Sequence, residues 1–111
     1  LIQMLFDGLI DSLSVAEGNI QRNEIQAKGD SLNRAIRIVV GLQASLDLEK
    51  GGEIAANLAD LYAYCSRRLL HANLKSDVEA VQEVKKLMSE IREAWAQVPD
   101  LMQKQPLMNV G

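Results

Sequence analysis

Apolar residues recur along this chain every three or four positions, which is the spacing of one face of an α-helix. This spacing predicts four helices, over residues 1–21, 24–46, 53–74 and 77–98. Each helix exceeds the length that isolated propensity can hold in water, so packing of the apolar faces is expected to keep them folded. The expected core face of the third helix consists of Ile54, Leu58, Leu61, Tyr62, Cys65, Leu69 and Ala72.

Local signals at the helix ends support these boundaries. Asn23 with Gln26, and Ser76 with Glu79, have the spacing of a capping box, in which side chains bond the free N–H groups at a helix start. The pair Gly51-Gly52 predicts that one helix ends and the chain reverses before the next begins.

Four helices with short connections, and no alternating strand pattern, predict an all-α fold, an antiparallel up-down-up-down four-helix bundle over residues 1–98. Pro99 ends the last helix, and residues 99–111 carry no helical period. This segment is expected to be a loosely ordered tail. The chain starts at Leu1 inside an amphipathic pattern, so we expect it to lack its natural N-terminus.

The third helix carries more apolar and small residues than one core stripe needs. Beside its core face lies a second stripe at helical spacing, formed by Ala56, Ala59, Ala63, Ser66 and Leu70. Alanine is a good helix former, so this stripe could be an ordinary surface. Alternatively, small residues let a second backbone approach closely, which favours a groove for an amphipathic helix.

The second helix shows a similar surplus, because Ile38 and Val40 lie about 90° or more to either side of its core direction. Two neighbouring helices with surplus apolar surface favour a partner-binding groove between them. Asn57 is expected to pair with backbone groups of the partner. The residues predicted to line or flank the groove are Ile36, Ile38, Val40, Asn57, Ala59, Ala63, Ser66 and Leu70.

Composition and charge narrow the function further. The net charge of −3 and pI of about 5.1 make nucleic acid a poor partner, and no apolar run is long enough to cross a bilayer. A single cysteine excludes an internal disulfide and fits a reducing compartment. Cys65 and His71 lie on different sides of their helix, and no Glu-x-x-His pair or P-loop is present. The sequence therefore predicts no enzyme activity, cofactor or metal site.

Two other functions remain open from the residues alone. The surplus surface would also suit a helical module that associates with a copy of itself. An exposed histidine on a four-helix bundle can carry a phosphoryl group, so His71 followed by Leu74-Lys75 leaves a histidine phosphotransfer domain as an alternative. The glycine that usually follows such a histidine is missing.

Four stretches resemble one family of proteins. Residues 1–8, LIQMLFDG, are similar to the pattern L-I-x-M-L-Y/F-D-G, and residues 46–55, LDLEKGGEIA, to L-D-x-E-K-G-G-E-I-A. Residues 57–73 resemble N-L-x-x-L-Y-x-Y-x-x-R-R-L-x-x-A-N, and residues 93–95 match E-A-W. Together these motifs resemble the FliS family of flagellar export chaperones over residues 1–99.

This resemblance implies a four-helix bundle in the bacterial cytosol that binds the disordered C-terminal region of flagellin, largely as helices. It implies that the chaperone prevents premature polymerisation until flagellin leaves through the flagellar type III export apparatus, and that it has neither enzyme activity nor a cofactor. Other export components are possible further partners. The family's tyrosine-bearing N-terminal arm, which precedes the first helix and can fold against the binding surface, is absent from this sequence.

Overall fold

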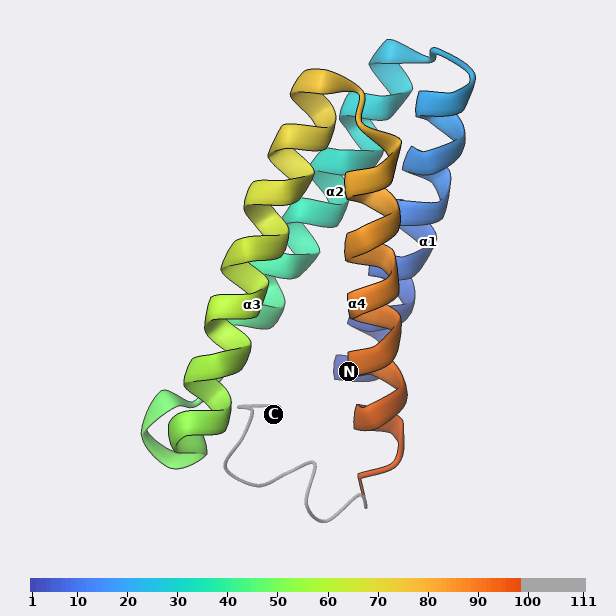
Figure 1. Ribbon diagram of the computed structural model, residues 1–111. Coiled ribbons are helices and arrows are strands. Elements are labelled where there is room, and N and C mark those ends of the chain that lie inside the picture. The colour runs from blue at the N-terminus through green and yellow to red at the C-terminus, as the bar shows by residue number, and fades with distance from the viewer. Residues whose placement is uncertain (99–111) are drawn as a thin grey trace.

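The computed structural model describes residues 1–98, which form four α-helices. They are α1 (Ile2–Gln21), α2 (Ile25–Ala44), α3 (Leu48–Lys75) and α4 (Val78–Ala96). The helices lie side by side in an elongated bundle (Figure 1). The described part of the chain contains no strand. The tail predicted for residues 99–111 lies outside the described residues.

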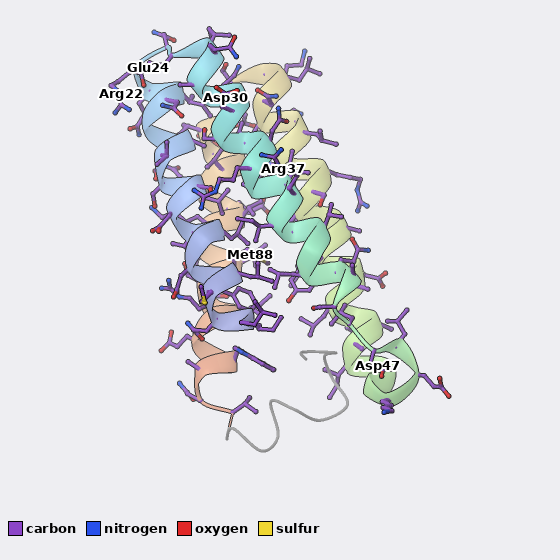
Figure 2. All side chains as sticks on the ribbon, turned by 180° about the vertical axis from the view of Figure 1, so that it is seen from behind. Arg22, Glu24, Asp30, Arg37, Asp47 and Met88 are labelled. Atoms are coloured by element: carbon purple, nitrogen blue, oxygen red, sulfur yellow. The ribbon has the colours of Figure 1, made fainter. Side chains whose placement is uncertain are left out.

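Each helix packs against its neighbours in the chain, and α4 also packs against α1, which closes the ring. The core between them is aliphatic, with Leu9, Leu13, Val39 and Leu69 completely buried. Met88 of α4 lies inside the bundle (Figure 2). The predicted all-α, up-down-up-down four-helix bundle is confirmed.

The α1–α2 connection differs from the predicted capping box. Asn23 adopts a left-handed conformation, with φ of 55°, and its side chain does not cap α2. The amide of Glu24 donates to the carbonyl of Asn19 over 2.8 Å and the amide of Asn23 to Ile20 over 3.1 Å. These two hydrogen bonds form a Schellman motif, which ends α1. The motif requires one residue in the left-handed conformation, and asparagine tolerates that conformation. Arg22 and Glu24, labelled in Figure 2, pair across this turn at 3.0 Å.

The α3–α4 connection also contains a left-handed residue, so the capping box predicted for Ser76 is wrong too. Ser76 is the left-handed residue that ends α3, with φ of 51°. Asp77 follows it directly and caps α4, because its carboxylate accepts from the amides of Glu79 and Ala80 at 3.1 and 3.3 Å. The cap falls one residue later than predicted because Ser76 is used to end the preceding helix.

The α2–α3 connection contains a helical turn that the sequence did not predict. Asp47, labelled in Figure 2, accepts from the amide of Lys50 at 2.9 Å and starts α3 four residues before Gly52. The helix then breaks at Gly52, whose φ and ψ are 55° and −133°. The expected break at the glycine pair is therefore correct at Gly52, but the reversal occurs earlier, between Ala44 and Asp47.

With 28 residues, α3 is longer than α2 and α4, which have 20 and 19. Its first turns extend away from α4, so the two helices diverge from their short connection toward this end of the bundle (Figure 1). Ile54, which the periodicity placed in the core, is 65% exposed because it lies in this overhang. Ala55 is buried instead.

A buried lysine joins the other end of α3 to α2. Lys28 is only 6% exposed, and its ammonium donates to the carbonyl of Asn73 and to Ser76 Oγ, each over 2.8 Å. A positive charge is favourable at a helix C-terminus, where carbonyl groups lack partners within the helix. Lys28 therefore satisfies the end of α3 and sets its position along α2.

We predict that Gly52→Ala destabilises the protein by about 1–3 kcal/mol, because a side chain strains a residue with this φ and ψ. The matched control is Gly41→Ala in α2, where an added Cβ meets no atom within 4 Å. That change should stabilise the protein by up to about 1 kcal/mol. Urea unfolding followed by circular dichroism measures both. Equal effects of the two substitutions would contradict the strain at Gly52.

We predict that Lys28→Met costs about 1–3 kcal/mol, because it leaves the Asn73 carbonyl and the Ser76 hydroxyl without their buried donor. The exposed Lys86 on α4 provides the control, since Lys86→Met should change stability by less than about 0.5 kcal/mol. The same urea experiment compares them. A Lys28 variant as stable as the control would show that the ammonium does not support the end of α3.

Candidate partner-binding groove

The contact of Lys28 with Asn73 gives the register of the antiparallel pair α2 and α3. Moving eight residues along α2, from Lys28 to Ile36, corresponds to about eight residues back along α3, which brings Ile36 level with about Cys65. Val40 comes level with about Leu61 by the same count. Ile36 and Val40 of α2 therefore lie level with the predicted small-residue stripe of α3.

Small side chains form the α3 part of this surface. Ala59, Ala63 and Ser66 are all half-buried, and Ala59 also packs against the core. The hydroxyl of Ser66 is buried and has no hydrogen-bond partner. These side chains are small enough for a second backbone to approach α3 closely.

Larger aliphatic residues stand on either side of the small ones. Val40 on α2 is 51% exposed and Leu70 on α3 is 57% exposed, while Ile36 is half-buried against the core. Leu74, one turn beyond Leu70, is 78% exposed and extends the same side of α3. We call Ile36, Val40, Ala59, Ala63, Ser66 and Leu70 the α2–α3 groove.

Two predicted residues do not share this groove. A Cβ on Gly8 of α1 would lie 3.6 Å from the Ile38 Cδ1 atom, so Ile38 lies on the α1 side of α2. Asn57 is exposed and lies seven residues before Tyr64, which is two helical turns along the same face of α3. The Tyr64 hydroxyl donates a hydrogen bond to Glu83 of α4. Because Asn57 shares this face of α3, it also lies on the α4 side. Both residues therefore lie away from the small-residue stripe, and their role in binding a partner stays a prediction.

On that α4 side, polar contacts hold α3 in place. The Tyr64 hydroxyl donates to Glu83 Oε2 at 2.6 Å, and Arg68 Nε donates to Glu83 Oε1 at 2.8 Å. The hydrogen bond from Tyr64, followed by that from Arg68, lowers the pKa of Glu83. The same bond raises the pKa of Tyr64. We call Tyr64, Arg68 and Glu83 the α3–α4 clasp.

The structure places the cysteine in the core and the histidine at the surface. Cys65 is buried in the core, as predicted, and burial raises the pKa of its thiol to about 11. His71 is exposed near the end of α3, with its Nε2 atom 3.2 Å from Asp77 Oδ2. Residues 1–98 contain no group of three or more His, Cys, Asp or Glu side chains that could hold a metal ion.

The structure also contains an apolar pocket that the periodicity did not predict. It has a volume of about 200 Å³ and lies at the end of the bundle where α3 and α4 diverge. Its lining comes from α1, α3 and α4 and from the residues just after α4: Phe6, Leu58, Tyr62, Ile91, Ala94, Trp95 and Val98. The one sequence signal for this pocket was that the chain's few aromatic residues all lie on or near core faces. The pocket itself could not be predicted, because helix periodicity does not show that two helices diverge.

The fold places the chain among four-helix bundles, and Val40 of α2 and Leu70 of α3 are exposed apolar residues on its surface. A family model described as flagellar protein FliS matches residues 1–102. The chain belongs to the FliS family, as its motifs indicated.

Similar proteins carry the same description. The chain is 52% identical over 99 residues to the flagellar secretion chaperone FliS of Salmonella typhimurium, covering 88% of this chain and 73% of that protein. It is 50% identical over 96 residues to the chaperone of the same name from Escherichia coli, covering 86% and 71%. The Vibrio cholerae chaperone is 35% identical over 99 residues, covering 89% and 73%.

These names bear on one further prediction. Secretion chaperones are a non-enzymatic class, which agrees with the prediction that the chain is not an enzyme. Across residues 1–98, every helix is too short or too polar to cross a membrane.

We predict that Glu83→Gln reduces the acid sensitivity of the fold. Because the pKa of Glu83 is lowered in the folded state, its carboxylate stabilises the protein above its unfolded pKa, and this contribution is lost as the pH falls through the folded pKa. Unfolding free energies measured from pH 7 down to about pH 3 should therefore fall less steeply in the variant. Glu90→Gln, at an exposed position on the same helix, is the control. Parallel curves for Glu83→Gln and the native chain would show that the clasp adds no acid-sensitive stability.

Proposed function

We propose that this chain is a cytosolic flagellar export chaperone that binds the C-terminal region of flagellin. Binding keeps this region from polymerising before export through the type III apparatus. Membership of a family of flagellar secretion chaperones supports the proposal. The observation that carries it is the α2–α3 groove, which provides exposed apolar surface on a folded bundle.

The chemistry of the groove fits a client that is disordered when free. Such a segment becomes ordered on binding, which costs free energy that buried apolar surface must offset. Val40 and Leu70 each expose about half of their surface, so covering them contributes about 1 kcal/mol each. Several such contacts are needed, so the client must bind over a long stretch. The groove runs along α2 and α3, which suits an amphipathic helix.

The groove gives each residue class a separate role. Ala59 and Ala63 set how closely the client helix can approach, because any larger side chain would hold it away. Val40 and Leu70 bury client side chains on the two edges. Ser66 adds a third small, half-buried side chain to this surface.

A self-associating bundle would use the same groove against a second copy of itself. Light scattering over a range of protein concentrations separates the two cases. A mass that stays at one chain leaves the groove available to flagellin, whereas a mass that rises to that of a dimer, and falls again when flagellin peptide is added, would show that both occupants compete for it.

We predict that Ala63→Glu weakens binding of a flagellin C-terminal peptide at least tenfold, which is about 1.4 kcal/mol. The larger, charged side chain prevents close approach and places a charge against apolar client residues. Calorimetric titration measures the affinity, and circular dichroism reports the helix that the peptide gains. The control is Ala27→Glu, because Ala27 is an exposed alanine on the α1 side of α2.

Thermal unfolding must first show that both variants keep the native fold. If folded Ala63→Glu binds as tightly as Ala27→Glu, the client binds elsewhere and the α2–α3 groove has another role. If the native chain binds no flagellin peptide at all, the proposed function itself fails.

A further inference from the structure

The pocket between the diverging ends of α3 and α4 differs in chemistry from the α2–α3 groove. The chain has four aromatic residues, and Phe6, Tyr62 and Trp95 line this one pocket. Leu58 and Ile91 complete its walls. A compact pocket of about 200 Å³ with aromatic walls fits one or two side chains and is too small for a long helix.

We propose that this pocket is the docking site of the chain's own C-terminal segment, residues 99–111, with a methionine of that segment as the side chain that enters it. The proposal concerns contacts within one chain and does not depend on flagellin binding.

The path of the chain favours this occupant. Val98, the last described residue, is itself part of the pocket wall. Leu101 and Met102 follow after three and four residues, and an extended chain spans about 3.3–3.6 Å per residue. The backbone therefore allows these side chains to lie within about 10–14 Å of the pocket wall.

The composition of the segment matches the pocket. Its apolar residues are Leu101, Met102, Leu107, Met108 and Val110, while Asp100 and Lys104 are its charged residues. Methionine is flexible and fills irregular apolar gaps, and its sulfur makes favourable contacts with aromatic rings. A pocket with three aromatic rings is thus a suitable environment for a methionine thioether.

A polar group in the pocket wall supports entry of a peptide segment. Tyr62 is completely buried, and its hydroxyl has no hydrogen-bond partner among residues 1–98. A buried hydroxyl without a partner costs free energy, and a chain segment that enters the pocket brings backbone carbonyl groups that can accept from it. An apolar small molecule would cover the rings but would leave Tyr62 without a partner.

Tethering favours the chain's own segment over a second copy. A short flexible linker gives an effective concentration in the millimolar range, which exceeds the protein concentration in ordinary solution work. The contact is therefore expected to form within one chain and to be independent of dilution.

Methyl NMR of the whole chain, with 13C-labelled methionine methyl groups, tests the proposal. The chain has four methionines, and two of them provide references, because Met4 is 72% exposed and Met88 is completely buried in the core. We expect Met102 or Met108 to show an upfield ring-current shift and nuclear Overhauser effects to the rings of Phe6, Tyr62 or Trp95. Both signals should persist on tenfold dilution.

Substitutions identify the residue that enters. Met102→Gln or Met108→Gln should remove these effects and change the fluorescence of Trp95, the one tryptophan of the chain, while Met4→Gln on the surface of α1 should not. The proposal is overturned if neither tail methionine contacts an aromatic ring. It is also overturned if the contacts disappear on dilution, since the occupant is then a second copy.

Discussion

The attachment of the end of α3 to the start of α2 through the buried Lys28 ammonium sets the positions at which these helices meet. An ammonium buried without its carbonyl and hydroxyl acceptors would be very costly, so the two helices cannot slide relative to each other without losing both bonds. This register places Ala59, Ala63 and Ser66 level with Ile36 and Val40.

The length of α3 is the second constraint. Because α3 continues beyond the ends of its neighbours, it diverges from α4 and leaves apolar surface that the bundle does not cover. The Tyr64–Arg68–Glu83 contacts lie on the α4 side of α3, where they hold the two helices together before they separate.

Two apolar surfaces therefore lie on different sides of α3, and their chemistry differs. The α2–α3 groove is long, aliphatic and lined by small residues, which suits a helix over several turns. The pocket at the open end is compact and aromatic, which suits single side chains. The bundle exposes both surfaces, while the aliphatic residues Leu9, Leu13, Val39 and Leu69 stay completely buried between its helices.

Much of this protein could be predicted from the sequence by itself. The period of apolar residues determined the four helices, their antiparallel order and most of the core, because helix geometry depends on neighbours three and four residues apart. The motifs of residues 1–8, 46–55 and 57–73 determined the family. Only the tertiary structure decided which side of each helix faces which neighbour, and so moved Ile38 to α1 and Asn57 to the α4 side. It also decided that Asn23 and Ser76 end helices instead of capping them, and that Tyr62 and Trp95 border an open pocket. These features depend on the register and divergence of whole helices, which arise from contacts between residues far apart in the chain that a local period does not contain.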